Sequence, residues 1–227
     1  MADNDAQKAK AGEAAAALVE AGMTVGLGTG TTAAHFVRAL AARKLDVQGV
    51  STSEATEALA RALGLRTLPL DEARSIDLTV DGADEIGPGL ALIKGGGAAL
   101  LREKLVWEAS RRCVVIADAS KVSTVLGGFP LPIEVVRFGH THTANAIADV
   151  LVDFGLPTPR LRTKDGAPVI TDSGNLIYDA GRGAIEEPAQ LAGALKSITG
   201  VVDHGLFLDL ADQAFIAGDT GVEVLTP

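Results

Sequence analysis

The chain has 227 residues, of which 47% are hydrophobic and 22% charged, as in an ordinary globular protein. Its net charge of −9, from 29 acidic and 20 basic residues, argues against nucleic acid as a partner, because binding to the phosphate backbone needs a basic face. No apolar run approaches the roughly 18 residues of a membrane span, and the single cysteine, Cys113, cannot form an internal disulfide. We therefore expect a cytoplasmic protein that contacts neither nucleic acid nor membrane.

The first half of the sequence predicts helices and strands in alternation. An alanine-rich helix over 5–21 precedes a strand over 23–27, a glycine loop and a helix over 33–42. The elements that follow are a strand over 47–50, a helix over 55–63, strands over 65–68 and 76–80, a helix over 98–111 and a strand over 113–117. Ser51 and Glu54 have the spacing of a capping box for the helix over 55–63. This alternation predicts a doubly wound, mostly parallel sheet.

A glycine and proline cluster over 127–132 is typical of a domain boundary. Beyond it we expect a strand over 133–138, a helix over 143–154, strands over 158–162, 169–172 and 176–178, a helix over 188–198 and a strand over 201–208. That order predicts a smaller, ferredoxin-like α+β domain. The tail over 213–225 reads as two short strands that return to the first domain. We therefore expect a Rossmann-like catalytic domain, residues 1–128 with 209–227, and a second domain, residues 129–208.

The loop Gly28-Thr29-Gly30-Thr31-Thr32 lies between a strand and a helix. Backbone N–H groups at a helix start attract anions, and glycine lets the backbone approach a ligand closely. The hydroxyls of Thr29, Thr31 and Thr32 favour a monophosphate. A dinucleotide is less favoured because Glu54, the only candidate for a ribose-binding acid, is already explained as a capping residue. A purely structural tight turn is the remaining alternative.

Acidic residues and a lysine follow the apolar runs of the central segment. Asp81 and Asp84 come directly after the strand over 76–80, and Lys94 closes a second apolar run before Gly95-Gly96-Gly97. Such strand ends hold ligands in open α/β sheets. Consecutive glycines cost conformational entropy and suggest close approach of the backbone to a ligand. We interpret Asp81, Asp84 and Lys94 as functional and Glu85 as a surface charge.

Other charged residues are ambiguous from periodicity alone. Glu103 lies in Arg102-Glu103-Lys104, which as a helical segment is usually an exposed charged face. Lys121, just past a strand, is equally compatible with a surface position or a site. His140 and His142 lack a nearby Cys or acidic partner, so we expect no metal site and no cofactor.

Read in order, GLGTGTTA, VDGADEI, LIKGGGAALLREK and ADASK closely resemble ribose-5-phosphate isomerase of the A type. The resemblance covers essentially the whole chain, including FPLPIEV at the boundary and ITDSGN in the second domain. It implies that Glu103 is the base that moves a proton between carbons 1 and 2 of the open-chain sugar, with Asp81, Asp84 and Lys94 completing the catalytic group. The substrate-binding residues that it implies are Lys8, Thr29, Gly30, Thr31, Thr32, Asp81, Gly82, Ala83, Asp84, Lys94, Gly95, Gly96, Gly97 and Lys121.

The resemblance further implies a metal-independent aldose–ketose isomerase of the non-oxidative pentose phosphate pathway. It would interconvert D-ribose 5-phosphate and D-ribulose 5-phosphate through an enediolate, as a homodimer or homotetramer. Two other hypotheses remain open from the sequence. One is a non-catalytic sugar-phosphate sensor, although the chain has no basic DNA-binding segment, and the other is a nicotinamide-dependent oxidoreductase built on the glycine loop.

Overall fold

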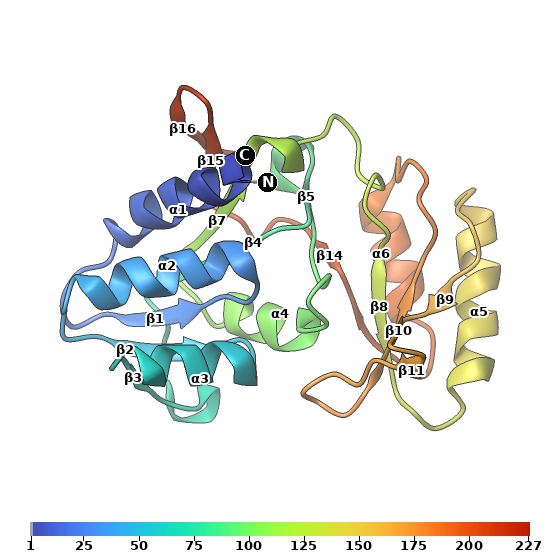
Figure 1. The fold of residues 1–227 in the computed structure, drawn as a ribbon. Helices are drawn as coiled ribbons and strands as arrows, with labels where there is room; N and C mark the ends of the chain where they lie inside the picture. The colour runs from blue at the N-terminus through green and yellow to red at the C-terminus, as the bar shows by residue number, and fades with distance from the viewer. Residues whose placement is uncertain (1) are drawn as a thin grey trace. The chain divides into compact units, whose positions relative to one another are not determined.

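The computed structural model describes residues 2–227, which form two compact units (Figure 1). Unit 1 comprises the described residues up to Ala83, together with Arg102–Lys121 and Asp209–Pro227. Unit 2 comprises Asp84–Leu101 and Val122–Leu208. This division differs from the boundary expected after residue 128, because residues 84–101 and 122–128 belong to unit 2. No helix among residues 2–227 is long and apolar enough to cross a membrane.

Unit 1 is built on a seven-stranded sheet in the order β16-β15-β7-β4-β1-β2-β3. Its strands are β1 (Thr24–Leu27), β2 (Gln48–Ser51), β3 (Arg66–Thr67), β4 (Leu78–Gly82), β7 (Cys113–Asp118), β15 (Gln213–Gly218) and β16 (Gly221–Leu225). All neighbouring strands are parallel except β15 and β16, which form an antiparallel hairpin. The doubly wound, mostly parallel sheet is thus confirmed, and the C-terminal tail joins it through β15.

Four helices accompany this sheet. They are α1 (Ala2–Ala16), α2 (Thr31–Ala42), α3 (Glu54–Ala62) and α4 (Leu100–Glu108). Figure 1 shows α1 and α2, in blue, side by side, and both contribute to the largest apolar core of the unit. The expected capping box is wrong, because the N-cap of α3 is Ser53 rather than Ser51, and its side chain accepts a hydrogen bond from the Thr56 amide. The expected helix over 98–111 is shorter at both ends, since Ala98 has a positive φ and the helix ends at Glu108.

The pleat of β1 and β4 separates the two faces of the sheet. Val25 and Leu27 pack in the core with α1 and α2, whereas a Cβ at Gly26 would meet side chains of Thr79 and Val106. Successive side chains of a strand point to opposite faces, so Asp81 follows Thr79 toward the face covered by α4. Thr79 also bonds the hydroxyl of Ser110, just beyond α4, at 2.6 Å. The C-terminal end of α4 therefore lies near the amino ends of the strands, and its first turn lies toward their carboxyl ends.

Unit 2 contains a four-stranded antiparallel sheet in the order β13-β8-β12-β9. Its elements are β8 (Pro132–Val135), α5 (His140–Asp153), β9 (Arg160–Leu161), β12 (Leu176–Asp179), α6 (Pro188–Lys196) and β13 (Val201–His204). Numbered along the chain, the strands lie in the order 4-1-3-2, which is the ferredoxin-like arrangement. The expected strand over 169–172 makes only an isolated bridge, between Ile170 and Leu176, because its neighbours form a turn.

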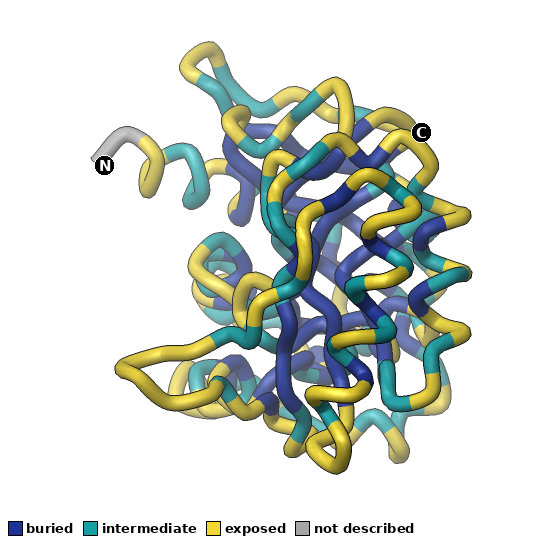
Figure 2. The backbone as a smooth tube through the Cα atoms, turned by 90° about the vertical axis from the view of Figure 1, so that its right-hand side faces the viewer, coloured by how far each residue is buried: buried dark blue, intermediate teal, exposed yellow. Residues whose placement is uncertain are grey.

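A second, smaller sheet of unit 2 has the order β14-β6-β5. It consists of β5 (Glu85–Ile86), β6 (Leu92–Ile93) and β14 (Leu206–Phe207), and a separate hairpin joins β10 (Thr163–Lys164) to β11 (Ala167–Pro168). Pairing with β14 explains why the segment after Asp84 belongs to this unit. Figure 2 shows that buried backbone follows the strands, while loops and the outer turns of helices are exposed.

Candidate functional site

The carboxyl ends of β1 and β4 mark a topological switch point in unit 1. From β1 the chain passes through α2 to β2 on one side, whereas β4 lies on the other side of β1. Ligands bind outside such points in open α/β sheets. The loop 28–32 leaves β1 here, and Gly30, with φ of 101°, precedes the first turn of α2 without a side-chain cap. The first turn of α2, with Thr31 exposed and Thr32 half-buried, has the free amide geometry that favours anions at helix starts.

The Thr29 hydroxyl forms hydrogen bonds inside the protein that hold the loop 28–32 in place. Its hydroxyl lies 2.7 Å from the Thr52 hydroxyl and 2.8 Å from that of Ser53, and the Thr56 hydroxyl donates to the Gly28 carbonyl at 2.9 Å. These buried hydroxyls tie the loop to the start of α3. Sequence reasoning treated the Thr29 hydroxyl as a phosphate donor, but the structure engages it within the protein.

Asp81 fixes the other side of the same loop. The side chain is fully buried, and Oδ1 accepts hydrogen bonds from the amides of Thr29 at 2.9 Å and Gly82 at 2.7 Å. A Cβ at Gly28 would lie 2.5 Å from the Cα of Asp81, so only glycine allows β1 and β4 to approach this closely. Asp81 is therefore held at the edge of the loop that sequence reasoning assigned to phosphate.

Glu103 is buried in the first turn of α4, with 4% of its surface exposed. The periodicity of its segment suggested an exposed face, and the family resemblance alone placed it in a site. The structure shows why periodicity failed: α4 packs against the sheet near its carboxyl ends, so even Lys104 is buried. Glu103 and Asp81 thus lie on the same face of the sheet, both toward its carboxyl edge.

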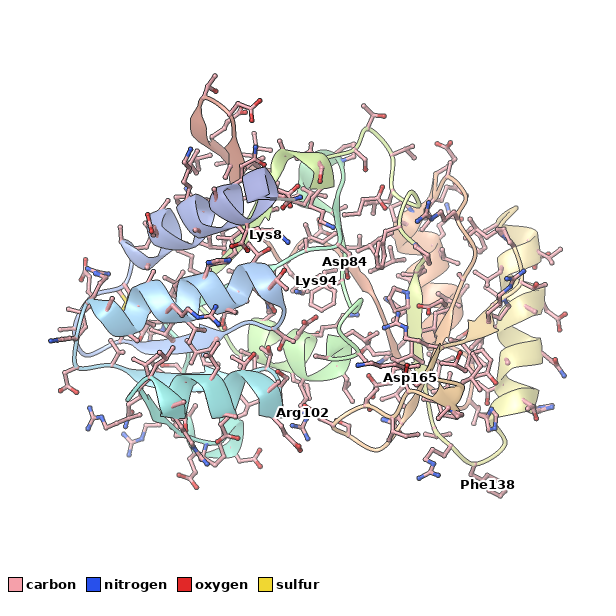
Figure 3. The ribbon with its side chains drawn as sticks, viewed as in Figure 1. Lys8, Asp84, Lys94, Arg102, Phe138 and Asp165 are labelled. Carbon is pink, nitrogen blue, oxygen red and sulfur yellow. The ribbon has the colours of Figure 1, made fainter. Side chains whose placement is uncertain are left out.

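Two lysines of unit 1, Lys8 and Lys121, lie at the edge of the sheet from which the loop 28–32 leaves β1. Lys8 reaches from α1, as Figure 3 shows, and its Nζ lies 3.1 Å from the Thr31 hydroxyl, which the first turn of α2 carries. Lys121 ends a short 3-10 helix, Ala119–Lys121, that follows β7 directly. Because β7 is parallel to β4, Lys121 follows a strand end at the same edge of the sheet.

In unit 2, Lys94 directly precedes the glycine loop 95–97 and Asp84 lies beside it; both residues are labelled in Figure 3. Asp84 Oδ2 accepts a hydrogen bond from the Gly96 amide at 2.7 Å. Lys94 is 2% exposed, and its Nζ lies 5.4 Å from the centroid of the Phe207 ring, within the range of a cation–π interaction. The described part of unit 2 therefore presents an acid and a lysine on one small, tightly hydrogen-bonded segment.

The structure explains why two positions of this loop, 95 and 96, are glycine. Gly95 has a φ of 105°, which other residues rarely adopt, and a Cβ at Gly96 would lie 2.6 Å from Asp84 Oδ1. Sequence reasoning expected close approach of the backbone to a ligand. The structure adds a reason within the protein, since the loop also packs closely against Asp84.

Glu85, interpreted from sequence as a surface charge, is buried. It accepts hydrogen bonds from the Ser123 hydroxyl at 2.7 Å and from the amides of Gly127, Gly128 and Phe129 at 2.9 to 3.2 Å. Its carboxylate thus organises the boundary loop. The sequence feature that could have indicated this role is the glycine pair Gly127-Gly128, 42 and 43 residues after Glu85, whose amides donate to its carboxylate.

Glu134 on β8 was not singled out from the sequence. It is 1% exposed, and Oε1 accepts hydrogen bonds from the Thr171 hydroxyl and the Asn175 side-chain amide, both at 2.9 Å. Burial raises the pKa of this carboxyl above its ordinary value of 4.5; Asp203 also raises it, while the two side-chain donors and the Leu101 amide lower it. Oε2 makes no hydrogen bond of ordinary geometry among the described residues. The motifs PIEV and ITDSGN therefore meet at one buried carboxyl.

Comparison with known proteins gives these residues a family context. The family model of ribose 5-phosphate isomerase A (phosphoriboisomerase A) matches residues 48–221. Ribose-5-phosphate isomerase A of Caulobacter sp. (strain K31) is 69% identical over 223 residues, which cover 98% of this chain and 99% of that protein.

Solved structures agree with the sequence comparison. Ribose 5-phosphate isomerase from Plasmodium falciparum superposes with a TM-score of 0.93 and 36% identity, covering 98% of this chain and 99% of that one. A D-ribose-5-phosphate isomerase in complex with phospho-erythronic acid has a TM-score of 0.92 and 35% identity, covering 99% of each chain. Because the family model matches residues 48–221 and a relative is 69% identical over 98% of this chain, the chain belongs to the ribose 5-phosphate isomerase A family.

Proposed function

We infer that the protein is an aldose–ketose isomerase that interconverts D-ribose 5-phosphate and D-ribulose 5-phosphate. The observation that carries this inference is the burial of Glu103 on the same sheet face as Asp81, toward the edge where the loop 28–32 begins α2. A base must be beside the carbon acid and shielded from water, while the phosphate needs a separate anion site. Family membership supplies the identity of the sugar.

The reaction can be written with Glu103 as the carbon base. Its carboxylate takes the proton from C2 of the open-chain aldose, and the C–H electron pair forms the C1=C2 double bond while O1 gains negative charge. O1 is then protonated, the O2 hydroxyl loses its proton as the C2 carbonyl forms, and Glu103 returns its proton to C1. One carboxyl thus serves both carbons in turn.

The remaining residues support the charges and the oxygens. We assign Lys94 to the oxyanion that develops on the enediolate, because a fixed cation in a water-poor site stabilises such charge strongly. Asp81 and Asp84 serve ring opening and the oxygen proton transfers. Each is already oriented by backbone amides, Asp81 by Thr29 and Gly82 and Asp84 by Gly96.

The phosphate end of the sugar supplies binding energy that orients the reacting end. We propose that the amides and hydroxyls at the start of α2, with Lys8 and Lys121, bind it. Thr29 contributes mainly by shaping the loop, since its amide and hydroxyl already bond to Asp81 and to the hydroxyls near α3. Gly82 and Ala83, between the two aspartates, contribute backbone contacts.

Incubation of the purified protein with ribose 5-phosphate, followed by detection of ketose, tests the proposal. We expect ribulose 5-phosphate to accumulate to equilibrium, without added nicotinamide cofactor and with full rate in the presence of a chelator. Binding of the sugar phosphate without ketose formation would instead identify a sensor. Ketose formation that requires a metal ion would contradict the proposed metal-independent mechanism.

We further propose a homodimer or homotetramer in the cytoplasm, in line with the family resemblance. The one cysteine, Cys113, is buried in β7, as suits a protein that needs no disulfide. Light scattering on the eluting protein measures the assembly directly, and a monomer at working concentration would contradict this part of the proposal.

A further inference from the structure

Arg162 contacts the glycine loop of unit 2 from outside the proposed catalytic group. Its Nη1 donates to the carbonyls of Gly95 at 2.8 Å and Gly96 at 3.1 Å. The side chain is 15% exposed; its bond to Gly95 is partly buried, whereas its bond to Gly96 is exposed. Hydrogen bonds from a charged donor contribute about twice as much as neutral ones.

Asp179, at the end of β12, holds the guanidinium in place. Its Oδ2 accepts from Arg162 Nε at 2.8 Å, and its Oδ1 accepts from Nη2. Two parallel bonds of this kind fix the plane of an arginine side chain. The remaining nitrogen, Nη1, is thereby directed at the loop rather than at solvent.

The loop needs such support because its backbone is strained. Gly95 has φ of 105°, and Ala98, which is not a glycine, has φ of 59°. Residues that carry a Cβ rarely adopt the left-handed region, so the surrounding structure must hold Ala98 there. The Gly95 carbonyl accepts from both the Ala98 amide, at 3.0 Å, and Arg162, so one oxygen joins the strained turn to the arginine.

The same turn carries proposed catalytic residues. The Gly96 amide donates to Asp84 at 2.7 Å, and Lys94 directly precedes Gly95. The peptide group that links Gly95 to Gly96 therefore has its carbonyl bonded to Arg162 and its amide bonded to Asp84. Displacement of that peptide would move the carboxylate of Asp84 and the backbone next to Lys94.

We propose that Arg162 is a positioning residue for the isomerase reaction, which fixes the glycine loop and through it Asp84 and Lys94. This inference rests on the proposed function. Arg162 touches no reacting atom, so its loss lowers the catalytic constant by misplacing other groups. Sugar phosphate affinity depends mainly on the loop 28–32 and changes little.

Replacement of Arg162 by Ala, with guanidinium ion added back, separates positioning from general stability. We expect Arg162→Ala to lower kcat by about 10- to 100-fold with KM within about threefold, since small misplacements have effects of this size. Millimolar guanidinium should raise the kcat of Arg162→Ala at least about fivefold, because the ion can occupy the vacated place between Asp179 and the two carbonyls. Arg160→Ala is the matched control: Arg160 is exposed, close in sequence and makes no side-chain hydrogen bond or ion pair among the described residues, and neither the substitution nor guanidinium should change the activity.

Amide hydrogen exchange of the segment 94–101 provides a second readout that needs no turnover. Faster exchange in Arg162→Ala, slowed again by guanidinium, supports the proposal, whereas unchanged exchange and kcat overturn it. Loss of activity without rescue, together with a lower melting temperature, shows a purely structural role and also overturns it. If the unmodified protein forms no ketose, the proposed function fails, and the exchange data still decide whether Arg162 holds the loop.

Discussion

Buried charged side chains cost free energy unless partners or a function compensate for them. Asp81, Lys94 and Glu103 are 0%, 2% and 4% exposed; Asp81 lies near the end of β4, Lys94 directly follows β6, and Glu103 is in the first turn of α4. Asp81 is compensated in part by two amides, and Lys94 by the face of an aromatic ring. We propose that these buried groups serve proton transfer at a carbon acid, which requires a base, an oxygen acid and a cation kept away from bulk water.

Lys8 allows a prediction at this scale. Substitution Lys8→Met removes the ammonium that lies 3.1 Å from the Thr31 hydroxyl but keeps most of the apolar stem. We expect KM for ribose 5-phosphate to rise about tenfold, equivalent to about 1.4 kcal/mol, with kcat nearly unchanged. Steady-state kinetics at low and high salt measure this.

Lys10→Met is the control for Lys8. Lys10 lies on the same helix, is exposed and makes no side-chain hydrogen bond or ion pair among residues 2–227. Its replacement should leave KM unaltered. Equal effects of the two substitutions would mean that Lys8 acts only through the overall charge of the protein.

At the scale of elements, the close approach of β1 and β4 determines where the loop and Asp81 meet. Gly26 and Gly28 on β1 and its loop leave room for Thr79 and Asp81 on β4. The alternation of the pleat then places Asp81 on the face of α4. The pairing of β1 with β4, the two glycines and the packing of α4 thus bring Asp81, Glu103 and the loop 28–32 to one edge of unit 1.

Gly28→Ala tests this arrangement. The new Cβ would lie 2.2 Å from Asp81 Oδ1 and 2.5 Å from its Cα, so the carboxylate and the strand must both shift. We expect a loss of stability of about 1 to 3 kcal/mol, typical of overpacking, and a larger relative loss of kcat. Gly218→Ala, where a Cβ meets nothing within 4 Å, is the control. Full activity in Gly28→Ala would show that the position of Asp81 is unimportant.

Glu134 gives a prediction for pH dependence. Its pKa is raised on folding, so the folded state binds the proton more tightly than the unfolded state. Its contribution to stability is therefore greatest below the ordinary value of 4.5 and decreases as pH rises through the raised folded value. Glu134→Gln keeps an acceptor for Thr171 and Asn175 but cannot ionise.

Urea unfolding at about pH 4 and about pH 8 measures this effect. We expect the stability of the Gln variant relative to the unmodified protein to be more favourable at the higher pH. An identical difference at both pH values would contradict the raised pKa.

At the scale of the whole molecule, the sequence predicted the fold class because helix and strand periods alternate cleanly and the tail carries a hairpin pattern. The boundary between units differs from the expected one, since β6 pairs with both β5 and β14, and its pairing with β14 joins segments more than 100 residues apart. Asp81, Asp84 and Lys94 were recognisable because they follow apolar runs. Glu103, Glu85 and Glu134 were not, because burial of a charged helix or strand position depends on tertiary packing that no local pattern encodes.

The central claim is that this chain isomerises ribose 5-phosphate with Glu103 as the base that moves the proton between C1 and C2. Conversion of ribose 5-phosphate is measured for the unmodified protein, Glu103→Gln and Glu108→Gln, and binding of ribose 5-phosphate to Glu103→Gln is measured by calorimetry. Glu108 is an exposed acid on the same helix and serves as the control. We predict that Glu103→Gln lowers kcat by about 10² to 10⁴-fold while binding remains, and that Glu108→Gln is unaffected. Undiminished turnover in Glu103→Gln would contradict the account.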